Sequence, residues 1–475
     1  MTVKENKMGT TPVFKLLISM AFPMIISMLI HSLYNVVDSI FVGKFSNDAL
    51  TAIGLAFPMQ NLIIALATGF GVGVNAILSK SLGERNHVKA SKTAINGCIL
   101  MLIVYLIFIL VGFTCLPKYM MLQTSNQSVI DFGVTYLKYI VIGCVFLLFS
   151  ITLERLLQST GRTFLVMIAQ LSGTIVNIIL DPILIFGLCG FKPLGIDGAA
   201  IATLIGQFTS FVFAFLLNIK YNKDLHFNKD TMKFDYKIIK EILKIGIPSA
   251  VMSAISSILT FMFNKVLFRF YDQNIPGTEQ TYKDLPQTVF GLYFKLNSIF
   301  FMPIFGMNNA LVPIVAYNYG AKNKEKMMKT MKYSLFIVFG MMLFGTTLFL
   351  TIPDKLLAVF AENKEIASQL SLIGVPCLRI ICSSFLIAAF CIVIMSMFQA
   401  LGNGFYSMVC SITRQLVVLL PTAYLLSLTN NLNLVWLSFL IAEVVAFVMS
   451  VILFKKMYNV KIKPLNNNLK ETIYG

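Results

Sequence analysis

Two aspartates, Asp38 and Asp181, lie inside long apolar stretches of the sequence, where a carboxylate is costly. At the centre of a bilayer such a group costs roughly 2.5 to 3.5 kcal/mol, and it usually faces a protein interior or a wet cavity that serves ion or proton traffic. Two carboxylates in a low-dielectric pocket repel each other, so one of them readily takes up a proton. The pair therefore predicts a cation or proton site, and a structural polar network between helices is the alternative.

Helix geometry places both aspartates in the same half of the membrane. At about 1.5 Å per residue, Asp38 lies close to the end of its apolar run at Lys44, and Asp181 lies in the corresponding half of a run that ends near Lys192. Asn177 lies one helical turn before Asp181 on the same face. We expect these residues to share one pocket with other polar side chains, namely Asn35, Tyr136 and Tyr139.

Three neighbouring residues each have two interpretations. His31, about two turns from Asp38, could relay a proton or be a satisfied polar group. Glu154, beside Arg155, could form a salt-bridged gate or a solvated helix end. Lys138 could pair with one of the aspartates, which would keep that carboxylate ionised and weaken the case for proton coupling.

The second half of the chain lacks acids that match Asp38 and Asp181. Its apolar runs contain one acid, Glu443, and several basic residues in or near them: Lys265, Lys295, Arg379 and Arg414. These cations could snorkel to the ends of the spans, or they could contact an anionic substrate or lipid. We expect Glu443 to pair with one of them, and ion coupling to be confined to the first half.

The composition identifies an all-α polytopic membrane protein. The 475 residues are 57% hydrophobic and 12% charged, with a mean hydropathy of +0.80, whereas a soluble globular domain has about 25% charged residues. The net charge of +17 lies in short loops between apolar runs, so we do not expect nucleic-acid binding. The eight cysteines are scattered through apolar segments without the spacing of a disulfide or metal framework.

Hydropathy predicts twelve membrane spans. They cover residues 14–43, 50–79, 93–116, 132–157, 163–188, 197–219, 242–268, 287–316, 331–352, 368–398, 405–428 and 433–454. The chain has no GxxxxGK[ST] phosphate loop and no HExxH motif, so the sequence implies neither an ATPase subunit nor an enzyme. We expect no cofactor.

The loops on one side carry roughly 26 lysines and arginines and those on the other side about seven, which predicts that both termini are cytoplasmic. We expect a multi-pass protein of the cell (inner or plasma) membrane, and its partners include the lipid bilayer.

An internal repeat divides the chain in two. Pro23 matches Pro248, the turn at Leu82-Gly83 matches Tyr319-Gly320, and residues 158–161 match residues 399–402. The repeat predicts an N-terminal six-helix lobe (1–219), a cytoplasmic linker (220–241), a C-terminal six-helix lobe (242–454) and a cytoplasmic tail (455–475). Because six is even, the two lobes are parallel repeats, a design that suits a transporter whose lobes rock about a central cavity.

The sequence resembles the multidrug and toxic compound extrusion (MATE) exporters, closest to the MepA-like/DinF-like prokaryotic branch. The resemblance covers essentially the whole chain. The segments that carry it are Pro23, Asp38, the two turns named above, residues 158–162 and, most specifically, residues 177–187 (NIILDPILIFG).

This resemblance implies twelve helices in two V-shaped lobes and proton- or sodium-driven export of lipophilic, cationic compounds. It implies a cation site at Asp38, Asn177 and Asp181, with Tyr136 nearby, where Na⁺ could also bind. Pro23 resembles a family proline that lets the first helix bend on protonation. The family's sodium-coupled branch has acids in its seventh and tenth helices, but Lys265 and Arg379 stand in those spans here.

We therefore predict a cation-coupled multidrug antiporter that uses H⁺ in preference to Na⁺ and binds small-molecule drugs or lipophilic cations. One alternative is a flippase for a lipid-linked or anionic substrate of the same superfamily, which would use the basic second lobe. Another is a membrane receptor or scaffold, but a scaffold has no need to bury paired carboxylates.

Overall fold

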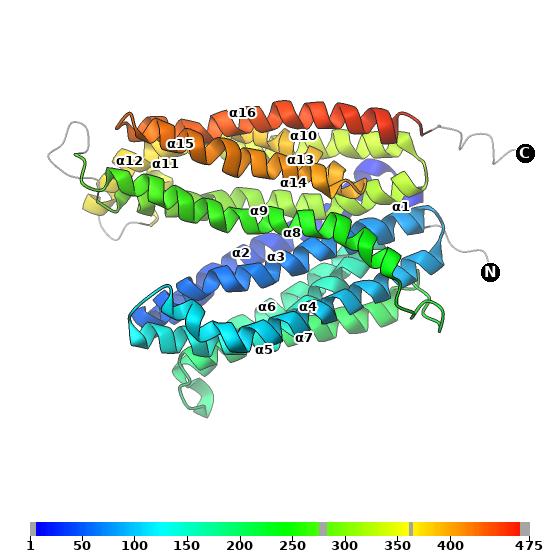
Figure 1. Ribbon diagram of the computed structural model, residues 1–475, viewed down its shortest axis with the longest axis horizontal. Coiled ribbons are helices and arrows are strands. Elements are labelled where there is room, and N and C mark those ends of the chain that lie inside the picture. Colours follow the sequence, from blue (N-terminus) through cyan, green and yellow to red (C-terminus); the bar gives the residue numbers. More distant parts are fainter. Residues whose placement is uncertain (1–5, 275–282, 361–363, 466–475) are drawn as a thin grey trace, which may run out of the picture.

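The computed structural model describes residues 6–274, 283–360 and 364–465, without the side chains of residues 35–40, 43, 44, 47, 50, 113 and 364–367 (Figure 1). The described part is helical and contains no strand element. Its first-half elements are α1 (Lys7–Thr10), α2 (Val13–Phe45), α3 (Asn47–Gly83), α4 (His87–Met121), α5 (Gln127–Ser159), α6 (Thr163–Phe186), η1 (Leu188–Gly190) and α7 (Ile196–Tyr221).

The second half contains α8 (Tyr236–Leu267), η2 (Phe268–Phe270), α9 (Leu285–Gly320), α10 (Lys324–Thr351), α11 (Pro353–Ala358), α12 (Lys364–Cys382), α13 (Phe385–Ala400), α14 (Gly404–Ile412), η3 (Thr413–Leu419), α15 (Leu420–Ser427), α16 (Leu432–Met457) and η4 (Tyr458–Ile462). Helices α2–α7 pack together as one lobe and α8–α16 as another, and the lobes meet mainly where α2 and α3 contact α8 and α9. The domain boundaries at 219, 241 and 454 stay predictions.

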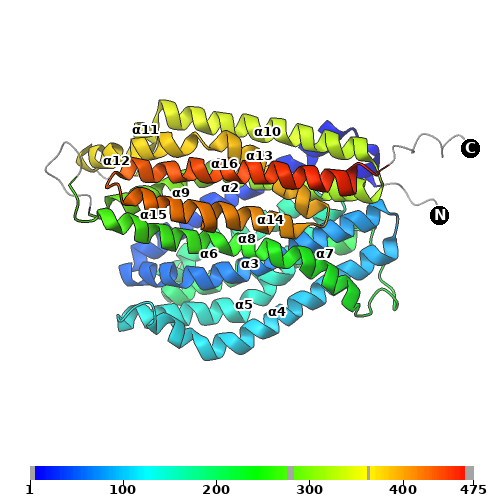
Figure 2. The same cartoon turned by 45° about the horizontal axis from the view of Figure 1, so that its top comes forward.

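The first and last described residues lie at the same end of the bundle (Figures 1 and 2), and in Figure 1 the ribbons of the two lobes are closer together there than at the opposite end. We call this end the basic end, because the turns and helix starts beside it carry Arg85, Lys89, Lys322 and Lys329.

Eleven helices of the described part are long and apolar enough to cross a membrane, and the pair Ser368–Cys382 and Phe385–Ala400, bent by 49°, would make a twelfth span. The predicted span 368–398 is therefore covered by two helices, and the helical run breaks at Ser383 and Ser384. Both hydroxyls bond back to carbonyls of the preceding turn, Ser383 to Ile380 (2.6 Å) and Ser384 to Ile381 (2.7 Å). Such bonds compete with the helical ladder, and hydropathy does not register them.

The predicted repeat is visible in the backbone of the turns. Arg85 and Lys322, at matching positions, have φ values of 59° and 56°, and Gly161 and Gly402 have φ values of 83° and 75°. A positive φ is rare outside glycine, so its recurrence at paired positions supports two copies of one design.

At the basic end the lobes touch backbone to backbone where α3 meets α9. A Cβ on Gly83 would collide with the carbonyl oxygen of Tyr317, and a Cβ on the repeat-related Gly320 would collide with that of Lys80. The contact is reciprocal, so each glycine of the repeated turn makes room for the other helix. Small residues of this kind let membrane helices approach closely.

A short N-terminal segment (residues 6–10) joins the two lobes at the same end. The Asn6 side-chain amide donates to the carbonyl of Thr160 in the first lobe (3.2 Å). The Asn318 amide of α9 in the second lobe donates to the carbonyl of Met8 (3.4 Å), and the Met8 side chain is fully buried. This polar start of the chain, which carries no hydropathy signal, is therefore built into the junction.

We predict that Gly83→Ala lowers the stability of the protein by about 1–3 kcal/mol, because overpacking forces packed backbones apart. Thermal unfolding in detergent would measure the loss. The matched control is Gly340→Ala on α10, where an added Cβ meets nothing within 4 Å, so that this change should be neutral or slightly stabilising. Equal melting temperatures for the two variants would contradict the close-contact interpretation.

Candidate cation-coupling site

Asp181 and Asn177 form a buried pair on α6. The Asn177 amide nitrogen donates to Asp181 Oδ1 over 3.1 Å, as the spacing of four residues on one helix predicts. Asp181 is 0% and Asn177 4% exposed. Pro182 follows inside the helix and removes one backbone hydrogen bond next to the carboxylate.

Neighbouring helices enclose this pair. α7 approaches so closely that a Cβ on Gly206 would lie 2.9 Å from Asn177 Cβ, and α2, the helix that carries Asp38, packs along α6. Tyr136 is buried on α5, which contacts both α6 and α7. The carboxylate of Asp181 is thus held inside the first lobe.

Two of the predicted site residues, Asn35 and Asp38, lie in α2, but their side chains are outside the described residues. A pocket shared by Asp38 and Asp181 therefore stays a prediction, and so does a Na⁺ site at Asp38, Asn177 and Asp181. Among the side chains that the structure describes, no group of three His, Cys, Asp or Glu residues is placed to hold a metal ion.

The other candidates near this site lie in different surroundings. His31 is exposed on α2, with its ring 6.0 Å from that of Tyr34. Tyr139 is partly buried and Lys138 is exposed on α5. Pro23 is buried inside α2, which is one continuous helix in this structure.

Glu154 belongs to a buried hydrogen-bond chain that the sequence did not reveal. Its carboxylate accepts from Ser150 Oγ (3.1 Å) and from Gln170 Nε2 (2.7 Å), and Gln170 in turn accepts from the Ser27 hydroxyl of α2. This Glu154 chain (Ser27, Gln170, Glu154 and Ser150) links α2, α6 and α5. Since Asp38 lies on α2 and Asp181 on α6, the chain joins the two helices on which coupling is predicted to depend.

Arg155 points away from this chain and crosses to the other lobe. Its Nη1 donates to Gln158 Oε1 (2.7 Å) and to Asn309 Oδ1 of α9 (2.9 Å). The solvated helix end is wrong, and a gating role for Glu154 stays a prediction. Among the described residues no ion pair joins Glu154 to Arg155, and Glu154 is buried instead of solvated. A search for every amide inside an apolar run, in addition to every acid, would have found Gln170 and Asn309.

In the second lobe the predicted partner of Glu443 is Arg414. Arg414 Nη1, in the π-helical turn η3, donates to Glu443 Oε1 of α16 over 2.9 Å, which confirms that Glu443 pairs with a basic residue. The three other basic residues named from the sequence for this lobe, Lys265, Lys295 and Arg379, are exposed. This position agrees with snorkelling at the ends of the spans.

We predict that Glu154→Gln destabilises the first lobe by about 1–3 kcal/mol, the cost of a buried donor left without an acceptor. Gln170 and Ser150 bond to different oxygens of the Glu154 carboxylate, and the bond from Ser27 orients the Gln170 amide. A glutamine at position 154 keeps one oxygen, which accepts from Gln170, so the Ser150 hydroxyl loses its acceptor. Thermal unfolding in detergent would show the loss. Glu84→Gln is the control, because Glu84 makes only an exposed pair with Lys80 (3.6 Å); equal shifts for both variants would argue against the Glu154 chain.

Comparison with known proteins agrees with this architecture. The chain is 27% identical over 438 residues to the multidrug export protein MepA of Staphylococcus haemolyticus, with 91% of each chain covered. Its fold is similar to a MATE protein crystallised in complex with MaL6 (TM-score 0.88, 26% identity, 97% of this chain and 100% of that one).

A further similar structure is a MOP superfamily transporter from Pyrococcus furiosus, for which a binding pocket of reverse polarity is said to suggest a different function (TM-score 0.87, 25% identity, 97% and 99% covered). These likenesses confirm the predicted two-lobed helical membrane fold and place the chain among transporters, not enzymes. A family model described as MatE matches residues 23–183 and 282–425. Since the matched segments make up more than half of its residues, the chain belongs to the MatE family.

Proposed function

We propose that this protein is a cation-coupled multidrug antiporter that exports lipophilic, cationic compounds from the cytoplasm, with H⁺ as the coupling ion in preference to Na⁺. The observation that carries the proposal is the enclosed Asn177–Asp181 pair of α6, which lies on a helix packed against the helix of Asp38. The similarity to MepA supports multidrug export. The basic end would face the cytoplasm of a cell membrane, as the lysine and arginine bias indicates.

In the proposed mechanism, a proton that enters from outside binds at the Asp38 and Asp181 carboxylates and relieves their mutual repulsion. Protonation of Asp181 also weakens the hydrogen bond from Asn177, because a neutral carboxyl accepts less strongly than a carboxylate. The Glu154 chain would carry this change between α2 and α6. Coupling then requires that proton and drug favour different arrangements of the lobes, or compete for one arrangement.

Sodium would use the same groups. The Asn177 amide donates through its nitrogen, so its oxygen remains available as a ligand beside the Asp181 carboxylate, and hard cations prefer such oxygens. A sodium gradient therefore belongs in the test of the coupling ion.

A flippase-like transport of an anionic substrate is the second candidate. For the Pyrococcus furiosus relative, reverse polarity of the binding pocket is said to suggest a different function, so a member of this fold need not export cations. Against flippase-like transport, Arg414 is neutralised by Glu443. A transport assay with both substrate classes distinguishes the two candidates, because a flippase would move anionic lipid analogues and would not move lipophilic cations.

We predict that Asp181→Asn and Asp38→Asn each reduce drug transport into inverted vesicles to the level of vesicles without the protein. Each substitution removes a carboxylate whose protonation is proposed to drive drug export. Drug uptake is measured with a pH gradient alone and with a sodium gradient alone, at matched protein expression. Asp131→Asn is the control, since Asp131 is exposed on α5 and bonded to Gln127. Uptake at the wild-type rate by both site variants would refute the proposal.

A further inference from the structure

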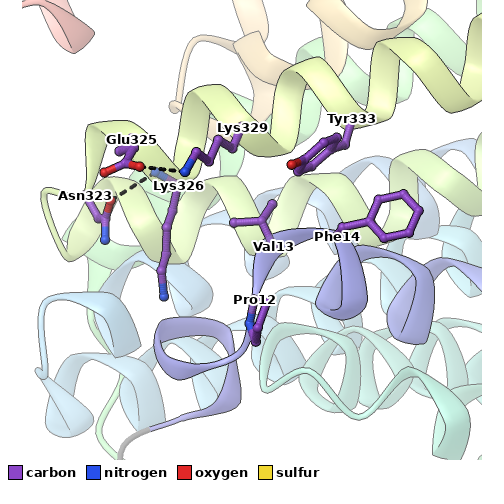
Figure 3. A pocket seen from close by; sticks show the side chains of 8 residues that line it. All are labelled: Pro12, Val13, Phe14, Asn323, Glu325, Lys326, Lys329 and Tyr333. Atoms are coloured by element: carbon purple, nitrogen blue, oxygen red, sulfur yellow. Dashed lines mark hydrogen bonds and ion pairs between the residues drawn. The ribbon is translucent and has the colours of Figure 1, made fainter.

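A hollow of about 330 Å³ lies between the start of α2 and the start of α10 at the basic end (Figure 3). Its lining is Pro12, Val13, Phe14, Asn323, Glu325, Lys326, Lys329 and Tyr333. Because α2 belongs to the first lobe and α10 to the second, a molecule in this hollow would contact both lobes. It lies outside the first-lobe site described above.

The hollow carries a net positive charge. Residues 322–332 contain five lysines and one acid. Lys326 donates to the carbonyl of Gly9, which leaves its charge in place, and Lys329 pairs with Glu325 over 2.6 Å (Figure 3). That pair is exposed, at 53% and 65% of the side chains, and an exposed pair contributes little stability. Lys329 can therefore exchange Glu325 for another anion.

The first turn of α2 adds to this preference for an anion. Pro12, its N-cap, makes no side-chain hydrogen bond, and the turn contains no acidic residue. The first-turn N–H groups of a helix carry partial positive charge. Pro12, Val13 and Phe14, which form this turn, line the hollow.

On one side the hollow is bounded by exposed aromatic rings. Phe14 is 52% exposed and its ring packs edge-on to Tyr333 at 5.5 Å. Phe336, 78% exposed, follows Tyr333 on α10 in the direction of the apolar part of that helix. Tyrosine above a band of apolar side chains marks the headgroup level of a membrane.

We propose that this hollow binds an anionic phospholipid of the leaflet at the basic end, with its phosphate at Lys326 and Lys329 and an acyl chain along Phe14, Tyr333 and Phe336. Basic pockets between membrane helices bind such headgroups. A free phosphate would satisfy the lysines but leave the aromatic surface unused. The lipid braces α2 against α10, and so stabilises the arrangement in which the lobes meet at this end.

Binding to the purified full-length protein tests the proposal by two readouts, thermal unfolding in detergent with added lipid and native mass spectrometry of retained lipid. Phosphatidylglycerol should raise the melting temperature and stay bound, and phosphatidylcholine should do neither. Lys329→Gln should weaken phosphatidylglycerol binding about fivefold, at about 1 kcal/mol for one lysine near the headgroups. Neither readout depends on export, so failure of the proposed transport function would be seen separately.

Two variants make the result specific. Glu325→Gln removes the competing carboxylate and should strengthen phosphatidylglycerol binding, whereas a purely structural Glu325–Lys329 pair would be damaged by either change. Lys332→Gln removes one exposed lysine of the same helix that does not line the hollow, and it should leave binding within twofold of wild type. Equal losses for Lys329→Gln and Lys332→Gln, weaker binding by Glu325→Gln, or the same stabilisation by inorganic phosphate would each overturn the proposal.

Discussion

Close backbone contact constrains how the lobes meet, and it is tightest at the crossing of α3 and α9, where Gly83 and Gly320 leave no room for a side chain. Between membrane helices the surrounding lipid supplies no hydrophobic driving force, so close packing and hydrogen bonds have to hold them together. At the basic end the glycine contact, the Arg155–Asn309 bond and the N-terminal segment supply both. Further along the same helices, two more hydrogen bonds cross between the lobes, from Asn61 to Ser257 (2.7 Å) and between Ser32 and Ser298 (3.4 Å). The lobes can change their separation away from the basic end only if these two bonds open while the glycine contact stays intact.

The two lobes handle buried charge differently. In the second lobe the guanidinium of Arg414 both orients and neutralises Glu443. In the first, the side-chain amide of Asn177 orients Asp181. A buried carboxylate that an arginine already neutralises has little need of an arriving cation, so the Arg414–Glu443 pair does not favour the second lobe as a coupling site. This contrast supports the expectation that ion coupling belongs to the first lobe alone, although the repeat gives both lobes the same helices.

The sequence predicted the features that depend on local chemistry. The helical class, the repeat and the Asn177–Asp181 pair follow from hydropathy, matched turns and a four-residue spacing. The ion pair of Glu443 follows from the cost of an isolated buried charge. The pocket shared with Asp38 stays a prediction, because that side chain lies outside the described residues.

The features that the sequence did not reveal depend on interactions between distant segments. Hydropathy treats Ser383 and Ser384 as ordinary members of an apolar run, yet the helix breaks at these two residues, whose hydroxyls both bond back to carbonyls of the preceding turn. Gln170 of α6 bonds to Glu154 of α5, and Asn309 of α9 bonds to Arg155 of α5. These bonds depend on how the helices pack, which the sequence alone does not show. Adjacent residues such as Glu154 and Arg155 point in different directions on a helix, and here they bond to different helices, α6 and α9.

The N-terminal segment also constrains how the protein is made. Met8 is synthesised before its partner Asn318, which follows 310 positions later. At about 5–20 residues per second, a ribosome takes roughly 15 to 60 s to cover that interval. During this time the carbonyl of Met8 lacks that donor, and one entire lobe can be inserted into the bilayer. The segment can bond to Thr160 of the first lobe early. Its docking onto the second lobe comes late in biogenesis, after Asn318 has been synthesised.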